Sequence, residues 1–270
     1  PVHSTSSRAS PRATGMSSSM NDQQEQKILY IADQLGGGSA ESLLELVQSQ
    51  QTLGTKPLIA FGDNNFVSER FQNLSNPVPM QRYYFRSWLT YGLRSRRWDG
   101  PARWMAAVPY HAWNIGRLLR NTRRHKTQMI HSNCIHLIEG GIMGKLLGLP
   151  HVWHVRELLN QDHYQYHINK NTITRVVNQL ATLVLCNSKQ TAKGLRELGV
   201  DENKLRVLYN IVEPPKSDEA KDLHQYLELD SQTQLVGIVG WLTPLKKIHQ
   251  FIEMASKLAD LGDTTRFLII

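Results

Sequence analysis

Short apolar runs alternate with amphipathic stretches along most of the chain. The first run covers residues 27–32, and three glycines, an apolar pattern at helical spacing and a second run at 57–62 follow it. A buried strand is continuously apolar, whereas a helix repeats its apolar positions every three to four residues. The order strand, glycine turn, helix, strand therefore predicts a βαβ unit with parallel strands and a right-handed crossover.

The alternation continues and predicts one α/β domain over residues 27–212, with a doubly wound parallel sheet of Rossmann-like type. Further strands are expected at 129–133, 151–157, 183–187 and 205–210, and further helices at 102–124, 141–147, 162–181 and 188–199. Ser39 and Ser188 are expected to be helix N-caps, because a side-chain hydroxyl can accept a bond from a first-turn N–H. Gly100 and Pro101 are expected to break the chain before the longest helix.

The two flanking regions differ from this domain in composition. Residues 1–26 are rich in Ser, Arg and Gln and poor in large apolar residues, so they are expected to form a disordered tail. Two prolines and a charged stretch predict a linker over 213–232. A new strand opens at residue 234 and a helix and another strand follow. Residues 233–270 are therefore expected to be the truncated start of a second, nucleotide-sugar-binding Rossmann-like domain.

Composition limits the class of protein. The chain has 270 residues, of which 40% are hydrophobic, but no apolar run approaches the roughly 18 residues of a membrane span. Its two cysteines, Cys134 and Cys186, have no C-x-x-C spacing that would indicate a disulfide framework or a zinc knuckle. We expect both to be reduced core residues of a cytoplasmic protein.

Positive charge is concentrated in one region. The net charge is +8, yet residues 82–126 hold ten Arg and one Lys against a single Asp, interleaved with nine aromatic residues. One interpretation is contact with an anionic membrane surface, where each charge contributes about 1 kcal/mol. The other is a solvated arginine face above aromatic core residues, because the apolar stripe of helix 102–124 must also pack on the sheet. Nucleic acid is not an expected partner, because no nucleic-acid-binding motif accompanies the charge.

Two glycine turns are candidate ligand sites. The second follows a strand at residue 235 and contains Gly240, with Lys246 and Lys247 before a helix, which is an arrangement that binds phosphate. The first turn, at 36–38, is not a dinucleotide fingerprint, because position 41 is Glu, and it is not a P-loop either. A tight turn without any ligand is an equal alternative for it.

Six segments, taken together and in order, resemble the retaining glycosyltransferases of family 4, which have the GT-B fold of two Rossmann-like domains facing across a cleft. The segments are 37–39, 130–133, 151–157, 187–188, 207–210 and 240–246. Each is weak by itself, and the ordered set covers about residues 27 to 270. The resemblance implies transfer of a hexose, with retention, from a nucleotide diphosphate sugar to a glycan or lipid-linked acceptor.

The resemblance also implies roles for particular residues of the first domain. Gly37 and Gly38 match the glycine loop beside the donor diphosphate, and His154 matches a catalytic histidine near the transferred sugar. The alternative for His154 is a buried, hydrogen-bonded core histidine. Four more residues are candidates for the acceptor side or the cleft: Ser39, Asn133, Arg156 and Glu157.

In the second domain the resemblance implies that Gly240 and Lys246 bind the donor diphosphate. Trp241 stands where the family has an arginine, and it cannot supply bidentate bonds. Lys247 stands where glycine is common. A glutamate motif that holds the donor would lie beyond residue 270, so little activity is expected of this chain alone. Neither a cofactor nor a metal is expected.

Two other functions are alternatives to the glycosyltransferase interpretation. The main alternative is a non-catalytic, basic, membrane-associated Rossmann-like module. A dehydrogenase is disfavoured, because the third fingerprint glycine and an acidic ribose ligand are missing from the matching positions.

Overall fold

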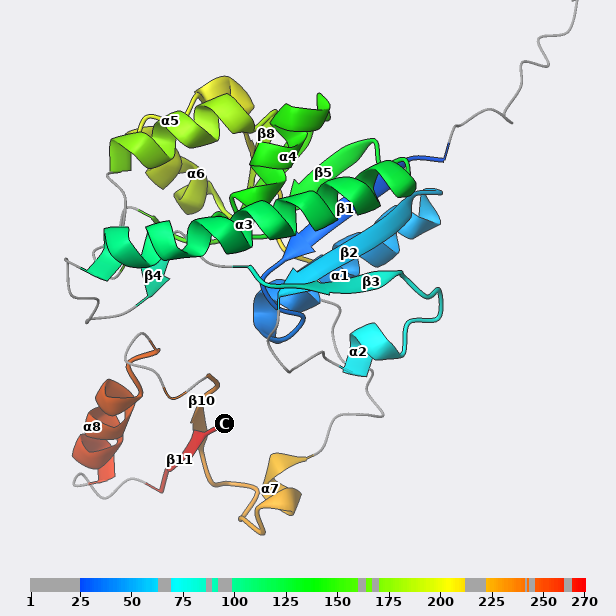
Figure 1. The fold of residues 1–270 in the computed structure, drawn as a ribbon. Coiled ribbons are helices and arrows are strands. Elements are labelled where there is room, and N and C mark those ends of the chain that lie inside the picture. The colour runs from blue at the N-terminus through cyan, green and yellow to red at the C-terminus, as the bar shows by residue number, and fades with distance from the viewer. Residues whose placement is uncertain are drawn as a thin grey trace, which may run out of the picture.

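The computed structural model describes residues 25–62, 69–85, 89–91, 99–159, 164–166, 170–211, 222–240, 242, 246–259 and 264–270. The expectations for the N-terminal tail and for Trp241 lie outside these residues. The fold is an α/β arrangement of Rossmann-like type, as predicted (Figure 1).

A seven-stranded, fully parallel sheet forms the centre of the larger part of the chain. Its spatial order is β3-β2-β1-β5-β6-β8-β9. The strands are β1 (Lys27–Ala32), β2 (Lys56–Gly62), β3 (Met80–Tyr83), β5 (Met129–Ser132), β6 (His151–Val155), β8 (Leu183–Cys186) and β9 (Leu205–Val207). The chain leaves β1 toward one side of the sheet and later returns to its other side with β5. Such a switch point opens a crevice at the carboxyl ends of the strands, where α/β proteins bind ligands.

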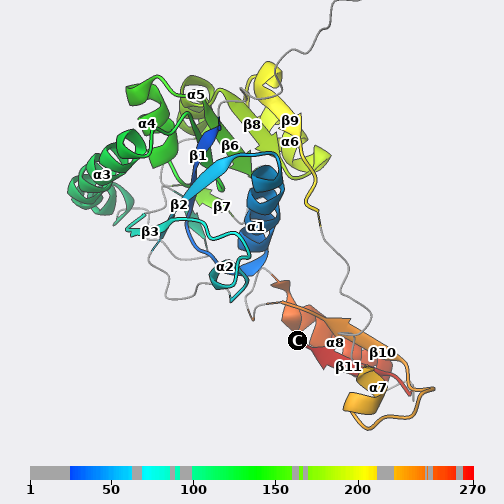
Figure 2. The same cartoon turned by 90° about the vertical axis from the view of Figure 1, so that its right-hand side faces the viewer.

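Helices cover both faces of the sheet. The helices of this part are α1 (Gly37–Thr52), α2 (Glu69–Gln72), α3 (Asp99–Arg124), α4 (Glu139–Leu147), α5 (Lys170–Leu180) and α6 (Lys189–Glu197). Figure 2 shows α1 on one side of the sheet and α3 and α4 on the other. Alternate residues of β1 enter the two cores accordingly: Tyr30 packs with the α1 residues Leu43 and Leu44, whereas Ile31 packs with Leu118 of α3 and Met143 of α4.

Several local predictions are corrected by the structure. Helix α1 begins three residues earlier than expected, with Gly36 as its N-cap and without a side-chain cap bond, so Ser39 lies inside the first turn. Gly100 and Pro101 belong to the first turn of α3. A proline is tolerated there, because the N–H groups of the first turn have no hydrogen-bond partner within the helix. The prediction for Ser188 is confirmed. It is the N-cap of α6, and its hydroxyl accepts a bond from the Thr191 N–H.

The segment predicted as helix 162–181 contains a strand before its helix. This strand, β7 (Tyr164–Tyr166), pairs antiparallel with β4 (Leu89–Tyr91), and α5 begins only at Lys170. Alternating Tyr, Gln and Tyr fit a short two-stranded ribbon, and the cross-strand partner that selects it is 75 positions away along the chain.

The C-terminal part forms a separate strand–helix–strand unit. The strands β10 (Leu235–Ile238) and β11 (Arg266–Ile269) pair in parallel, and α8 (Ile248–Ala259) connects them. The short helix α7 (Leu223–Tyr226) precedes the unit, inside the segment that was expected to be a linker. The unit of β10, α8 and β11 matches the predicted βα unit, although neither strand is fully buried. Among the described residues, no helix is both long and apolar enough to cross a membrane.

Candidate active site at the carboxyl edge of the sheet

The first glycine turn leads from β1 directly into α1. Gly37 has a φ of +74°, in the left-handed region that favours glycine. A Cβ added at Gly37 or Gly38 would meet nothing within 4 Å, so no packing requirement explains the two glycines. The backbone is therefore open to a ligand at the positive end of the α1 dipole.

The Arg156 side chain connects the loops that follow three strands, β5, β6 and β9. It lies directly after β6, and its guanidinium donates to Oδ1 of Asn133 at 3.2 and 3.1 Å and to Oδ1 of Asn210 at 2.7 Å. Asn133 follows β5 and donates in turn to the carbonyl of Ser39 in α1, at 3.0 Å. Three predicted site residues, Ser39, Asn133 and Arg156, are thus brought together, and they fix the first turn of α1 relative to the loops after β5 and β6.

His154 lies near the end of β6 and is only 2% exposed. Its Nδ1 atom lies 3.4 Å from the Arg156 guanidinium, which can only donate, so Nδ1 is the acceptor. Burial, with further contributions from Arg156 and His131, lowers the pKa of His154 to about 2, so the ring is neutral and its proton is on Nε2. Among the described residues, this buried Nε2 has no hydrogen-bond partner.

His131 of β5 lies beside His154, with ring centroids 5.5 Å apart and edge-on geometry. It is also buried, and its Nε2 likewise has no partner among the described residues. Burial, then the charge of Arg156, lowers the pKa of His131 to about 3. The strand ends therefore carry two neutral, desolvated imidazoles that are not fully hydrogen-bonded.

Glu157 contacts the Arg156 backbone and the His136 ring. Its carboxylate accepts a bond from the Arg156 backbone N–H at 3.0 Å and lies 3.5 Å from Nδ1 of His136. The other ring nitrogen of His136 is 3.1 Å from the carboxylate of Asp33, which follows β1. Burial by itself lowers the pKa of His136, but the bonds to Asp33 and Glu157 outweigh it and raise the pKa to about 9.

Sequence reasoning missed Asp33 and His136. They are 103 positions apart, and neither belongs to a short motif. The available signal was positional: each follows a predicted strand, and carboxyl ends of parallel strands meet at one edge.

The second glycine turn follows β10. The Gly240 N–H donates to the carbonyl of Ile270 at 2.9 Å, and a Cβ at Gly240 would lie 3.5 Å from the side chain of Lys246. The exposed Lys246 side chain therefore lies beside Gly240. Lys247 has a φ of +53°, a conformation that favours glycine, which agrees with the glycine common at this position in the resembling family.

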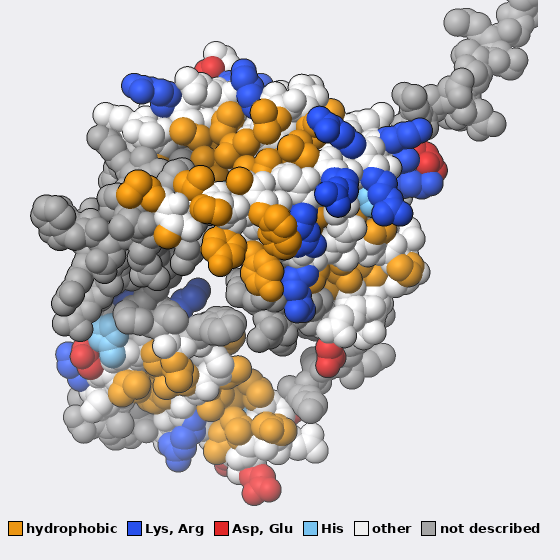
Figure 3. All heavy atoms as spheres, viewed as in Figure 1, with side chains coloured by type: hydrophobic (Ala, Val, Ile, Leu, Met, Phe, Trp, Pro, Cys, Tyr) orange, Lys and Arg blue, Asp and Glu red, His pale blue; other side chains and the backbone are white. Residues whose placement is uncertain are grey.

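The arginine- and aromatic-rich region is exposed over half of α3. Leu118 is buried and Ile115 and Leu119 pack on the core, but Met105, Val108, Tyr110 and Trp113 are between 47% and 68% exposed. Figure 3 shows hydrophobic side chains gathered over this face with Lys and Arg side chains beside them. Among the described side chains of the predicted apolar stripe, those in the C-terminal half of α3 pack on the core and those before them are exposed.

One cavity lies next to α3 and another lies at the amino edge of the sheet. One of about 330 Å³ is lined by Tyr84, Phe85, Tyr110 and His111, next to the exposed face of α3. The other, of about 590 Å³, lies at the amino edge of the sheet, near Lys27 and Lys56, and none of the predicted site residues lines it.

Comparison with solved structures gives GT-B glycosyltransferases. HepE from Anabaena, in complex with UDP and glucose, has a TM-score of 0.67 and 18% identity, over 91% of this chain and 60% of HepE. A glycosyltransferase from Rickettsia africae has a TM-score of 0.62 and 14% identity, over 91% of this chain and 60% of its own. The lipopolysaccharide outer core galactosyltransferase WaaB, in its apo form, has a TM-score of 0.56 and 11% identity, over 90% of this chain and 67% of WaaB.

These likenesses confirm the GT-B type of the fold, and the chain spans about 60% of the length of HepE. No curated protein matches the chain. A sequence profile of Glycosyltransferase Family 4 matches residues 36–215, which is more than half of the chain and includes the glycine turn, Asn133, His154, Arg156 and Glu157. The chain therefore belongs to Glycosyltransferase Family 4.

Proposed function

We propose that this chain is the acceptor-side domain and part of the donor domain of a glycosyltransferase. The enzyme transfers a hexose, with retention, from a nucleotide diphosphate sugar to a glycan or lipid-linked acceptor. The observation that carries this proposal is the desolvated Nε2–H of His154, without an acceptor among the described residues, on the strand-end edge where the glycine turn also lies. A sugar hydroxyl would supply the missing acceptor.

The donor diphosphate is proposed to lie between the two glycine turns. Gly37 and Gly38 let it approach the positive end of α1, and Lys246 beside Gly240 adds a full positive charge. These groups stabilise the charge that builds up on the leaving nucleotide. HepE has been solved with UDP, with UDP-glucose and with UDP and glucose, which supports a nucleotide sugar as the partner.

Positioning is proposed to supply most of the rate acceleration. Arg156 holds Asn133 and Asn210, and Asn133 holds Ser39, so the acceptor-side loops are fixed before the substrates bind. His154 donates its Nε2 proton as a hydrogen bond to the transferred sugar. Ser39, Asn133, Arg156 and Glu157 have the roles of orienting the cleft and the acceptor.

The acceptor is proposed to approach along α3. Exposed Tyr110 and Trp113 lie beside basic residues, a composition that suits the boundary of an anionic membrane. The adjoining 330 Å³ cavity, lined by aromatic rings, suits the stacking of a sugar or a lipid tail. The name of WaaB, a lipopolysaccharide galactosyltransferase, describes an acceptor of the same mixed type.

Nucleotide binding is the direct test, because we expect residues 1–270 alone to turn over little sugar. Calorimetry would compare UDP, GDP and ADP, each with and without a hexose. We expect one nucleotide to bind, Lys246→Ala to weaken its binding about tenfold, and the exposed α8 variant Lys257→Ala to bind normally. His154→Ala is expected to weaken the sugar nucleotide more than the free nucleotide.

The alternative function is the non-catalytic membrane module, which the exposed apolar face of α3 favours. It predicts co-sedimentation with anionic vesicles without binding of any nucleotide diphosphate. That pair of results, obtained with folded protein, would contradict the proposed transferase. Vesicle binding together with nucleotide binding supports the enzyme and its proposed peripheral location.

A further inference from the structure

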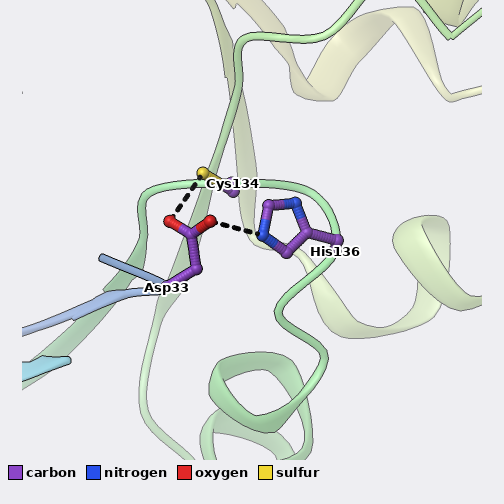
Figure 4. A group of neighbouring side chains, drawn as sticks. All are labelled: Asp33, Cys134 and His136. Atoms are coloured by element: carbon purple, nitrogen blue, oxygen red, sulfur yellow. Dashed lines mark hydrogen bonds and ion pairs between the residues drawn. The ribbon is translucent and has the colours of Figure 1, made fainter. Parts of the chain in front are cut away.

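Asp33, Cys134 and His136 form a compact group of side chains at the carboxyl edge of the sheet. Figure 4 shows the carboxylate of Asp33 between the Cys134 thiol and the His136 ring. Sγ of Cys134 lies 3.7 Å from one carboxylate oxygen, and Nε2 of His136 lies 3.1 Å from the other. One ligand atom from each residue lies within 4.8 Å of the other two. Cys134 and His136 are nearly inaccessible, at 3% and 4% exposure.

We propose that this group is a binding site for one divalent zinc-type ion, held by the carboxylate of Asp33, the thiolate of Cys134 and Nε2 of His136. Ligands at about 2.0 to 2.3 Å around a tetrahedral ion lie roughly 3.3 to 3.8 Å from one another. The observed separations of 3.1 and 3.7 Å are close to this range. A mixed set of sulfur, nitrogen and oxygen suits zinc, whereas calcium and magnesium prefer oxygen only.

Glu157 provides a second feature of metal sites. Its carboxylate lies 3.5 Å from Nδ1 of His136, the ring nitrogen that faces away from Asp33. A histidine that binds a metal usually donates its other N–H to a carboxylate, which fixes the ring orientation and the tautomer. Because the Glu157 carboxylate lies at Nδ1, Nε2 is the ring nitrogen that would bind the metal.

The charge of the group is the same with and without the ion. Without metal, two carboxylates face one imidazolium and one neutral thiol, since burial, then Glu157 and Asp33, raise the pKa of Cys134. A divalent ion would displace two protons, one from the thiol and one from His136. Two positive charges leave and two enter, so the buried group gains no net charge. Affinity is expected to rise with pH, because protons compete for both ligands.

The bound ion would connect the loops after β1 and β5, and through Glu157 also the loop after β6. The side chain of Asp33 is 29% exposed, which gives water a route to a fourth coordination position. This proposal differs from the expectation of no metal, which followed from the family resemblance and from the lack of an evident metal cluster in the sequence. The ligands come from segments about 100 positions apart, so no short motif records them. The proposal is independent of the transferase proposal.

Cobalt spectroscopy on the full 270-residue chain tests the site. After treatment with a chelator, Co²⁺ is expected to bind at about one ion per chain, with release of about two protons. It should give a thiolate-to-cobalt charge-transfer band and the intense visible bands of four-coordinate cobalt. Zn²⁺ should abolish these bands and raise the melting temperature.

Matched cysteine variants assign the ligand. The Cys186→Ser variant retains Cys134 as its only cysteine and should keep the charge-transfer band, whereas Cys134→Ser should lose it. Glu157→Gln should keep the band but weaken affinity 10- to 100-fold. Circular dichroism in chelator would establish that each variant is folded. Absence of the band in the folded wild type or Cys186→Ser protein, or its persistence in Cys134→Ser, would overturn the proposal. The test on the wild type and on Cys186→Ser needs no variant that lacks a proposed ligand.

Discussion

A pair of histidines and a single histidine, each with its neighbours, form two groups at the same edge of the sheet, and the two groups differ in charge. His131 and His154 are buried at the ends of β5 and β6 and are neutral, whereas His136 is equally buried and carries a proton. Burial opposes the charge in all three. The two carboxylates around His136 overcome this cost, and Arg156 beside the other two adds to it. Because all three rings are similarly buried, their neighbouring charges account for the difference in protonation.

The difference separates two tasks at one site. The charged His136 links Asp33 and Glu157, so it stabilises the loops after three strands. The neutral His154 keeps a donor for a ligand, which an ion pair would have consumed. Variants that alter one group without the other show whether the groups are independent. The stability measurements below are made in the presence of a chelator, so that only protons titrate the site.

The largest effect is expected from Gly62→Ala, which disrupts the charged group through the backbone. A Cβ at Gly62 would lie 2.1 Å from the carbonyl oxygen of Asp33, and that oxygen belongs to backbone that cannot rotate away. Overpacking of this kind should lower the free energy of unfolding by about 3 kcal/mol or more. Chemical denaturation measures it. Gly116→Ala in α3 is the control, because its Cβ would meet nothing within 4 Å; an equal loss there would refute the steric argument.

The second effect is expected from Arg156→Met, which removes the positive charge that acts on His131 and His154. Its bonds to Asn133 and Asn210 are lost, and about 2 kcal/mol of stability should be lost with them. The pKa of His154 should rise, because one of the causes that lower it is gone. Ring-proton NMR titration measures the shift, with the exposed Arg175→Met as the control. An unchanged His154 titration would show that burial acts alone.

Much of this edge was predictable, and the exceptions have physical causes. The strands β1 and β2 are apolar along most of their length because both faces are covered, so their sequence alone indicates them. β6 is just as buried, although it includes His151 and His154. β3 is an edge strand with polar residues and gave no such pattern. His154 and Arg156 were found through a local motif. The pairing of Asp33 with His136 depends on the order of strands in the sheet, which short motifs do not encode.

The third prediction concerns the alkaline side. The folded pKa of His136, about 9, is above the ordinary value of 6.5. Its contribution to stability is therefore complete below about pH 6.5 and is lost as the pH rises through 9. His136→Gln should cost about 1 to 2 kcal/mol at pH 6.5 and little above pH 9. Denaturation at several pH values measures the difference, and His125→Gln is the control. A cost that does not change with pH would indicate packing instead of charge.

The smallest effect at neutral pH is expected from His131→Phe, which tests the neutral group. The ring is already uncharged and packs on Tyr30 and His154, so an apolar ring should change stability by less than about 1 kcal/mol at pH 7. The folded pKa of about 3 is below the ordinary value, so the wild type loses stability as pH falls from 6.5 toward 3, because only the unfolded chain gains this proton. The variant should lose less than the wild type at pH 5. If both lose stability equally on acidification, His131 is already charged in the folded protein, and the contrast with His136 fails.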